Sequence, residues 1–204
     1  MKLLILGATG RTGLELVNQG LKRGFEVTAL VRSPQKIQIQ NEGLRVVTGN
    51  PLDESMLAQV LAGHDAVLST IGHLDLKRSY VVTDGARALV TAMKDNNVRR
   101  LVIISSTLVA PGGSFLTRIP RYITRHALND SAEMEKVIKR TSLDWTIVRL
   151  VRLTNGPETQ YQILENEPPS LSASISRKTV AACMLNLISN ESNFKGTISI
   201  RASR

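Results

Sequence analysis

The chain has 204 residues, of which 42% are hydrophobic and 21% are charged. This is the composition of an ordinary globular domain, and the length suits one domain with a sizeable core rather than two domains of usual size. The apolar runs are as short as strands, well below the roughly 20 residues of a membrane-spanning helix. We therefore expect one soluble domain over residues 1–204, in the cytoplasm and without a signal peptide.

The chain is strongly basic, with a formal net charge of +9 at pH 7. This charge favours anionic partners. Aromatic residues make up only 3% of the chain, which argues against the stacking platforms of proteins that bind single-stranded nucleic acid. The expected partners are therefore small anionic molecules, with neither nucleic acid nor a membrane involved. His, Cys and acidic residues do not cluster at the spacing of metal ligands, so we expect no metal.

A glycine-rich turn directly follows the first predicted strand, at residues 2–6. It reads Gly7, Ala8, Thr9, Gly10, Arg11, Thr12 and Gly13, and a helix is predicted from 12 to 23. In dinucleotide-binding folds such glycines allow a tight turn, a close approach of pyrophosphate to backbone, and helix–sheet packing. The amides at the helix start then face the phosphates. A turn that merely joins strand to helix is the alternative, but this strand–turn–helix context favours a dinucleotide site.

Six strand-like runs alternate with helical patterns along the first 150 residues. The strands are predicted at 2–6, 26–31, 44–48, 66–70, 100–105 and 144–150, and the helices at 12–23, 53–61, 79–95 and 129–140. This alternation is typical of parallel strands. Runs such as 101–104 are continuously apolar, as expected of strands that helices cover on both faces. The sequence therefore predicts an α/β fold: a single Rossmann domain with a doubly wound parallel sheet and helices on both faces.

The pattern is looser beyond residue 150, before a helix predicted at 177–189 and a last strand at 197–201. We expect segments 106–128 and 151–176 to cover the substrate. Within the first segment, Arg118, Arg121 and Arg125 are three and four residues apart and share a helical face. Contact with an acidic substrate tail and a solvated basic face are both open interpretations of this spacing.

The turn after the second predicted strand indicates which nucleotide is bound. A Rossmann unit that binds NAD has an acidic residue about 20 positions after the glycines, where it contacts the adenosine ribose. Here that position holds Arg32, with Ser33 and Lys36 close behind. Two cations and a hydroxyl would bind a 2′-phosphate well, so we expect NADPH and NADP+ to be preferred. A solvated basic turn is the alternative.

Dinucleotides lie across the carboxyl ends of the strands, so residues just after strands four, five and six should face the nicotinamide. These are Thr70, Ile71, Gly72, His73, Ser105, Ser106, Thr107, and residues 149–153, which include Arg152 and Leu153. The tyrosine with a lysine four residues later, usual in short-chain dehydrogenases, is missing: Tyr80, Tyr122 and Tyr161 are followed at that spacing by Asp, His and Glu. This favours acceptors that take hydride without a strong protein acid, such as flavins and linear tetrapyrroles.

The sequence also resembles the biliverdin reductase B/flavin reductase (NADPH) family of atypical short-chain dehydrogenases, which is close to the NmrA-like NAD(P)-binding proteins. The matching segments are 7–13, 25–32, 64–67, 85–94 and 155–157, together with Asp130, Lys136 and Val137. The resemblance implies an NADPH-dependent reductase of free flavins (FMN or FAD) and biliverdin-type tetrapyrroles. Protons can come from solvent in that family, and a monomer can suffice.

The resemblance also implies roles for individual residues. Residues 9–13 would hold the pyrophosphate, Arg32 and Lys36 the 2′-phosphate, and Asn50 with Pro51 the adenine. Asn50 stands where the family has an aspartate, a modest change because an amide still donates and accepts hydrogen bonds. Thr107 would match the family's serine near the nicotinamide.

Arg152 takes the place of the family's active-site histidine. An arginine cannot act as an ordinary proton donor, but it can grip a propionate or a phosphate. The leading interpretation is therefore an oxidoreductase whose acceptor site is lined by Ser106, Thr107 and Arg152. A non-catalytic NADP(H)-binding redox sensor of NmrA-like type and an epimerase-like enzyme are the alternatives. Of the histidines, His64 is expected to be structural, and His73 to lie on the cofactor side.

Overall fold

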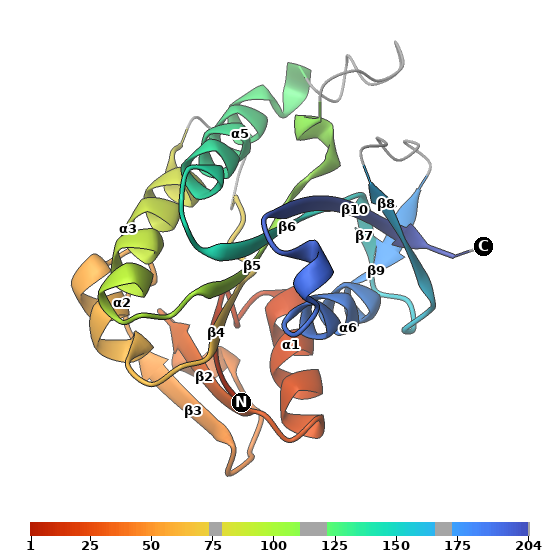
Figure 1. Ribbon diagram of the computed structural model, residues 1–204. Helices are drawn as coiled ribbons and strands as arrows, with labels where there is room; N and C mark the ends of the chain where they lie inside the picture. Colours follow the sequence, from red (N-terminus) through yellow and green to blue (C-terminus); the bar gives the residue numbers. More distant parts are fainter. Residues whose placement is uncertain (74–78, 111–121, 166–172, 204) are drawn as a thin grey trace.

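The computed structural model describes residues 1–73, 79–110, 122–165 and 173–203. Within these ranges an eight-stranded sheet forms the centre of the molecule (Figure 1). Its strands are β1 (Lys2–Leu6), β2 (Glu26–Val31), β3 (Leu44–Thr48), β4 (Ala66–Ser69), β5 (Arg100–Ser106), β6 (Asp144–Leu150), β8 (Tyr161–Glu165) and β10 (Gly196–Ala202). Their order is β3-β2-β1-β4-β5-β6-β10-β8. The six strands predicted over the first 150 residues are thus all present, each within one residue of its predicted bounds.

The order of the strands creates a topological switch point at the centre of the sheet, where open α/β sheets have a ligand-binding crevice. β1 pairs with β2 on one side and with β4 on the other, and both pairings are parallel. After β1 the chain forms β2 and β3 toward one edge of the sheet. It then crosses back and forms β4, β5 and β6 toward the other edge. At such a switch point the loops after the strands diverge, and ligands of open α/β sheets bind there.

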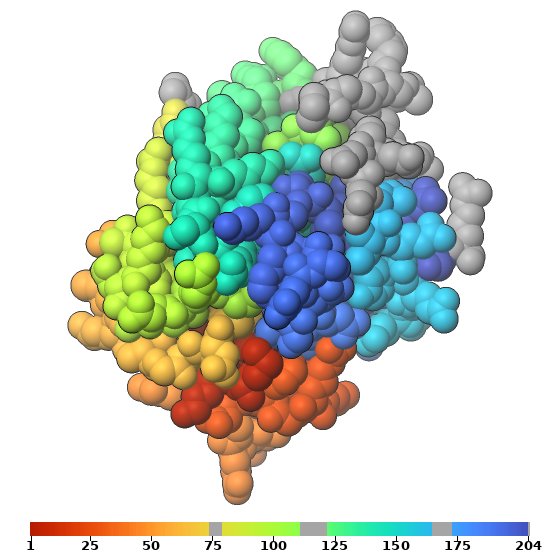
Figure 2. Space-filling view, in the orientation of Figure 1, coloured from red at the N-terminus to blue at the C-terminus, as the bar shows by residue number. Residues whose placement is uncertain are grey.

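Helices cover both faces of the sheet, as the sequence predicts (Figure 1). One face carries α1 (Arg11–Lys22) and α6 (Arg177–Leu187), which pack against each other. The other carries α2 (Glu54–Leu61), α3 (Val81–Asp95) and α5 (Arg125–Lys139), with α3 between the other two. In the space-filling view the amino-terminal elements, red to orange, form one end of the molecule (Figure 2).

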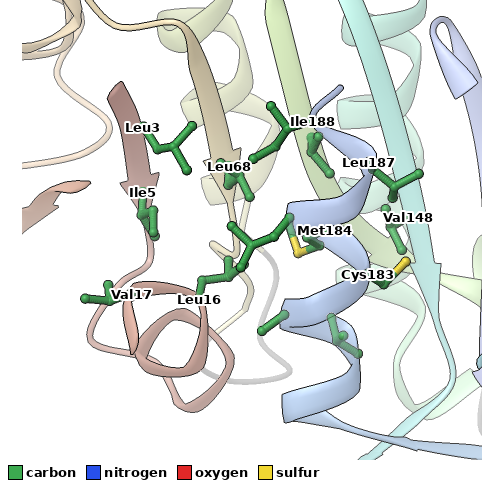
Figure 3. Packing of buried hydrophobic residues seen from close by; sticks show 14 of the residues in the cluster. Leu3, Ile5, Leu16, Val17, Leu68, Val148, Cys183, Met184, Leu187 and Ile188 are labelled. Carbon is green, nitrogen blue, oxygen red and sulfur yellow. The ribbon is translucent and has the colours of Figure 1, made fainter. Parts of the chain in front are cut away.

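A hydrophobic core fills the space between the sheet and each helical layer. On the α1 and α6 side, Leu3 and Ile5 of β1 face Leu16 of α1, and Met184 of α6 packs close by (Figure 3). Cys183 lies in the same layer and is fully buried. Burial raises the pKa of its thiol to about 12, so this cysteine packs as an apolar side chain.

Three strands beyond residue 150 are not predicted by the sequence. β8 pairs antiparallel with β10 at the edge of the sheet, so the sheet is mainly rather than wholly parallel. β7 (Arg152–Thr154) and β9 (Ser174–Ser176) form a separate parallel pair. Segment 151–176 is predicted to cover the substrate. Part of this segment forms β8, the edge strand of the main sheet. None of the helices in the described ranges is long and apolar enough to cross a bilayer.

Helix α5 begins at Arg125, four residues before the predicted start at 129. Asn129 and Asp130 resemble a helix N-terminus in the sequence, but both lie inside the helix. The carboxylate of Asp130 caps a different helix, because it accepts hydrogen bonds from the amides of Val82 and Thr83 in α3. Of the three arginines predicted to share a helical face, Arg125 is the first residue of α5, and Arg118 and Arg121 lie outside the described residues.

Candidate cofactor and acceptor site

The turn after β1 has room only for glycine at its first position. Gly7 has φ +78°, a conformation that other residues rarely adopt. A Cβ placed there would lie 2.7 Å from the Oγ1 of Thr70 and 2.8 Å from its carbonyl carbon. Thr70 belongs to the segment after β4, and its hydroxyl is within hydrogen-bond distance of the carbonyl oxygens of Leu6 and Gly7. The glycine turn and the segment after β4 are therefore packed against each other.

The last glycine of the motif allows helix α1 to start directly against the turn. A Cβ on Gly13 would lie 2.1 Å from the carbonyl oxygen of Gly7 and 2.7 Å from the Cα of Ala8. Gly10 is different, because it is exposed and a Cβ there would meet only the carbonyl oxygen of Gly7, at 3.2 Å. Gly7 and Gly13 therefore shape the turn, and Gly10 leaves its outer surface open to a close backbone contact with a ligand.

The amino terminus of α1 provides the positive end of this turn. Gly10 is its N-cap and offers no side-chain acceptor, and the first helical turn has no acidic residue. The first turn instead carries the exposed cation Arg11, with Thr12 buried beside it. Helix amides and a cation together favour an anion at this position. With Thr9 half-buried in the turn, these residues fit the pyrophosphate of a dinucleotide.

Arg32, Ser33 and Lys36 form a turn, called here the basic turn, at the carboxyl ends of β2 and β3. Arg32 follows β2 directly and is exposed. Ser33 stands at the N-cap position of a short 3₁₀ helix (Pro34–Lys36) without a side-chain capping bond, and Lys36 at the end of this helix is also exposed. The amide of Gly49 donates to the carbonyl of Val31 at 2.9 Å and holds the end of β3 beside this turn. The residues predicted to bind the 2′-phosphate thus gather at one edge of the crevice.

The residues predicted to contact the adenine follow β3. The side-chain oxygen of Asn50 accepts from the amide of Leu52 at 3.2 Å, so this oxygen stabilises the local turn. Asn50 is exposed and its amide NH2 group is the part left for a base, while Pro51 beside it is half-buried. Their contact with adenine stays a prediction, but they lie next to the basic turn, as that prediction requires.

On the opposite side of the crevice, the ends of β5 and β6 carry the predicted acceptor residues. Ser106 ends β5, and its hydroxyl oxygen accepts from the amide of Leu108 at 3.3 Å. Thr107 begins a short 3₁₀ helix (Thr107–Val109) and donates its hydroxyl to the carbonyl of Leu150 at 3.2 Å. Arg152 is exposed on β7, and Leu153 next to it is half-buried. Ser106 and Thr107 therefore lie at the end of β5, and Arg152 lies two residues after the end of the neighbouring strand β6.

The segment after β4 includes the predicted cofactor residues Ile71 and Gly72. Ile71 is half-buried and lines a small apolar crevice with Val82 and Gly85 of α3 and Met134 of α5. Gly72 is exposed and has no neighbour within 4 Å of a hypothetical Cβ. Ile71 therefore packs toward α3 and α5, and Gly72 has open space beside it. The contact of both residues with the cofactor stays a prediction.

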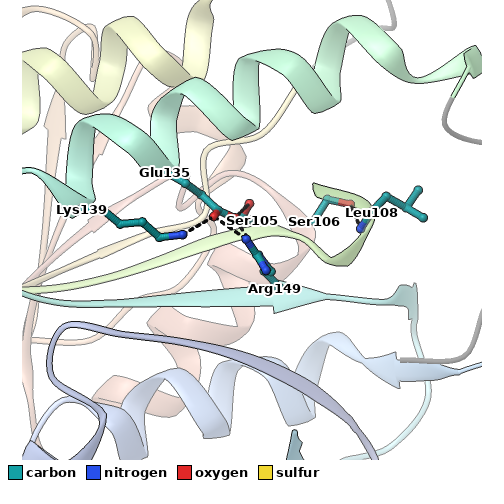
Figure 4. Close-up of polar contacts among 6 residues, drawn as sticks. All are labelled: Ser105, Ser106, Leu108, Glu135, Lys139 and Arg149. Carbon is teal, nitrogen blue, oxygen red and sulfur yellow. Dashed lines mark hydrogen bonds and ion pairs between the residues drawn. The ribbon is translucent and has the colours of Figure 1, made fainter. Parts of the chain in front are cut away.

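Ser105 holds a buried ion pair beneath the site (Figure 4). Its hydroxyl donates to Glu135 at 2.8 Å, and Arg149 donates to both oxygens of the same carboxylate, at 2.9 and 2.7 Å. Lys139 adds a contact at 2.9 Å. Burial alone would raise the pKa of Glu135, but the hydrogen bonds from Arg149, Lys139 and Ser105 lower it below its usual value. These contacts connect β5 and β6 to α5. The hydroxyl of Ser105 therefore stabilises the strands that lead into the predicted acceptor site.

A second buried carboxylate was not identified as a site residue from the sequence. Asp130 is 1% exposed, and one of its oxygens lies 3.1 Å from the Nε2 of His73. The other accepts from the amide of Thr83 at 3.0 Å. His73 and Asp130 are 57 residues apart, and no local pattern links a loop residue to a helix residue at that distance. In the described part of the chain, no three His, Cys, Asp or Glu side chains gather as a metal site would require.

Comparison with known proteins is decisive for the family. A family model described as NAD(P)H-binding matches residues 7–191. The chain belongs to this NAD(P)H-binding family. An uncharacterized chloroplastic protein of Arabidopsis thaliana is 33% identical over 95% of this chain and 74% of its own length. The photosystem II assembly factor Ycf39 of Synechocystis is 30% identical over 82% of this chain. This chain spans about half the length of that protein.

Solved structures agree with the fold of this NAD(P)H-binding protein. A Rossmann-fold NAD(P)-binding family protein from Shigella flexneri is 26% identical, with a TM-score of 0.77 over 98% of this chain and 93% of its own. A short-chain dehydrogenase/reductase from Veillonella parvula, solved in complex with NADP, has a TM-score of 0.83 at 20% identity, over 98% of this chain and 94% of its own. ChuY, an anaerobillin reductase from Escherichia coli O157:H7, has a TM-score of 0.85 at 20% identity, over 99% and 97%. The predicted Rossmann fold and nicotinamide cofactor are confirmed.

Proposed function

We propose that this protein is an NADPH-dependent oxidoreductase that transfers hydride to a free flavin, FMN or FAD, or to a biliverdin-type linear tetrapyrrole. The observation that carries the proposal is the composition of the crevice. One side holds the glycine turn and the basic turn, and the other offers Ser106, Thr107 and Arg152 without a tyrosine–lysine pair. When bound, NADPH supplies a hydride and leaves as NADP+.

The preference for NADPH over NADH rests on Arg32, Ser33 and Lys36. An NAD-specific site places a carboxylate where Arg32 stands, to accept hydrogen bonds from the ribose hydroxyls. A guanidinium at this point donates to a phosphate instead, and hydrogen bonds to a charged group contribute about 1.5–3 kcal/mol. Both Arg32 and Lys36 are exposed, so a phosphate can reach them without a rearrangement of the core.

The acceptor class rests on Arg152 and on the positions of the tyrosines. Tyr161 lies on edge strand β8, where its hydroxyl accepts from Asn186 at 3.2 Å. Tyr122 is 69% exposed near the start of α5, with the guanidinium of Arg125 over its ring. Neither has a lysine four residues later. A planar acceptor with an acidic tail suits a site in which Arg152 binds the tail and no tyrosine acid is present. The fold neighbour ChuY, named as an anaerobillin reductase, supports a bilin as one such acceptor.

The test is steady-state oxidation of NADPH by the purified chain with FMN, FAD and biliverdin in turn. We expect turnover of at least one acceptor and a raised KM for that acceptor in the Arg152→Ala variant. The matched control is Arg45→Ala, which removes an exposed arginine near the amino end of β3. An unchanged KM in Arg152→Ala would remove the proposed role of this residue. NADPH that stays unoxidised with every acceptor would refute the proposed activity.

A second function is favoured by one feature of the sequence and one of the comparisons. The usual acid pair of short-chain dehydrogenases is missing, and several relatives are named as assembly factors rather than enzymes. A redox sensor that binds NADP(H) and changes its affinity for a partner protein would need no such pair. Tight binding of NADPH without turnover across the acceptor panel would favour this second function.

A further inference from the structure

The contact between His73 and Asp130 joins a loop residue to a fully buried carboxylate. The Nε2 of His73 lies 3.1 Å from Asp130, whose side chain is 0% exposed, while 15% of the His73 side chain remains exposed. Asp130 is held rigidly, because it also accepts hydrogen bonds from the amides of Val82 and Thr83 at the start of α3. The histidine is thus held by a buried, hydrogen-bonded carboxylate, and a small part of its side chain remains exposed.

The topology places His73 on the cofactor side of the sheet. It comes three residues after Thr70, which packs on the glycine turn. In the pairing of β4 with β5, Ser69 lies opposite Ile103. Asp130, the partner of His73, lies on α5, and α5 also contacts the 3₁₀ helix that begins at Thr107. His73 therefore lies at the level of the predicted acceptor residues, at the edge where the nicotinamide of a bound cofactor would lie.

The contact with Asp130 also determines which ring nitrogen of His73 is available to donate a proton to an acceptor. A carboxylate accepts hydrogen bonds, so Nε2 carries a proton toward Asp130. The other ring nitrogen, Nδ1, has no hydrogen-bond partner among the described residues. In the cationic form of the ring Nδ1 carries a second proton that can be donated. This is the arrangement in which a buried aspartate orients a catalytic histidine and stabilises its cation.

We propose that His73 is the general acid of this protein, protonating the acceptor through Nδ1 while Asp130 acts as its positioning residue. The inference rests on the proposed reductase function and deepens it. Two electrons and one proton move together as hydride from NADPH to the acceptor, which gains one negative charge, while the nicotinamide is oxidised. The Nδ1–H bond of His73 then breaks, its proton bonds to a nitrogen or oxygen of the acceptor, and solvent reprotonates the neutral ring.

Several other charged groups on the neighbouring elements form ion pairs with one another. On α3, Asp84 contacts Arg87 at 3.1 Å, and on α5 Glu133 contacts Lys136 at 2.7 Å. Glu135, which faces β5 and β6, is held by Arg149 and Lys139. Of the ionisable groups on these elements, Asp130 is the one in contact with His73. A general acid acts in its protonated form, so the activity should fall as the pH rises.

The first experiment compares His73→Asn with the wild-type chain and with the control variant His64→Asn. His64 bonds Thr28 and Leu61, at the opposite end of β4 from His73. We expect His73→Asn to lower kcat for the acceptor by about 10²-fold or more, as loss of a general acid does. The rate of this variant should no longer fall at high pH, and its affinity for NADPH should stay within about twofold of the wild-type value. His64→Asn should match the wild type in all three.

The second readout needs no turnover. ¹⁵N NMR of the histidine rings should show the Nε2–H form for His73 in the wild type and a mixture of tautomers in Asp130→Asn. Addition of NADP+ should shift the signals of His73 and leave those of His64 in place. Asp130→Asn should also lower kcat, and its lower thermal stability would reflect the lost cap on α3.

The outcomes separate this inference from the proposed function. If the wild type oxidises NADPH with an acceptor and His73→Asn has the same kcat and pH profile, His73 is only a packing partner and the inference is wrong. The inference is also wrong if the His73 signals do not respond to NADP+. If the wild type turns over none of the acceptors, the proposed function fails, and the general-acid role of His73 fails with it.

Discussion

Replacement of Arg149 by methionine tests whether the ion pair beneath the site stabilises the fold. Methionine retains much of the side-chain volume but leaves the carboxylate of Glu135, whose side chain is 3% exposed, without the two hydrogen bonds from Arg149. Breaking a buried pair by removal of one partner costs about 3–5 kcal/mol. Lys139 and Ser105 still contact the carboxylate, so we expect a loss of about 3 kcal/mol in the free energy of unfolding.

The assay is urea denaturation, followed by the fluorescence of the single tryptophan, Trp145, which is buried in β6. With a denaturant dependence of about 3 kcal/mol per molar urea, the expected shift in the midpoint is about 1 M. Arg99→Met is the matched control, because Arg99 pairs with Asp144 at 3.1 Å but its side chain is 64% exposed. Exposed pairs contribute at most about 1 kcal/mol. A loss in Arg149→Met no larger than in Arg99→Met would refute the reasoning.

The effect of Arg149→Met should also depend on pH. Hydrogen bonds from Arg149, Lys139 and Ser105 outweigh burial and lower the pKa of Glu135 in the folded chain. A carboxyl with a lowered folded pKa contributes stability above its unfolded pKa, about 4.3 for glutamate, and this contribution is lost as the pH falls through the folded value. The difference between wild type and variant should therefore be full at pH 7 and shrink below about pH 4. The double variant with Glu135→Leu should recover most of the loss at pH 7.

Three further predictions concern the cofactor turn, the cofactor preference and the buried thiol. Gly13→Ala places a methyl group 2.1 Å from the carbonyl oxygen of Gly7, so calorimetry should detect no NADPH binding, whereas Gly24→Ala, on the far side of α1, should still bind. Arg32→Ala should weaken NADPH binding by about 10- to 100-fold and leave NADH binding unchanged; equal losses for both cofactors would refute the role of Arg32. Burial raises the pKa of Cys183 to about 12, so a thiol-specific disulfide reagent at pH 8 should label the chain only in urea; rapid labelling of the folded chain would contradict this.

The sequence predicts the strands of the parallel sheet well because their burial leaves a strong pattern. Strands covered on both faces are continuously apolar, as at 101–104, and glycines or polar residues bound them. Strand β8 has no such pattern, since it is short, lies at the edge and includes the exposed residues Gln162 and Ile163. β7 and β9 have three residues each, too few for any periodicity to appear.

The candidate site is predictable from the sequence only where function dictates local spacing. The glycine turn and the basic turn are each read from a single short stretch. The pairs His73–Asp130 and Glu135–Arg149 depend on tertiary contacts between residues far apart in the chain. A partial signal exists for the second pair, because Arg149 interrupts an apolar strand and Glu135 lies between the buried residues Met134 and Ile138 of α5. A charged residue within an otherwise apolar pattern indicates that a partner of opposite charge lies nearby, but the sequence does not identify the partner residue.

Isothermal titration of the purified wild-type chain with NADPH, and in parallel with NADH, tests the central claim most directly. If the glycine turn binds a pyrophosphate and the basic turn binds a 2′-phosphate, NADPH should bind with measurable heat at a stoichiometry of one per chain and more tightly than NADH. The absence of heat with either nucleotide would contradict the assigned cofactor site, and equal affinities would contradict the role given to the basic turn.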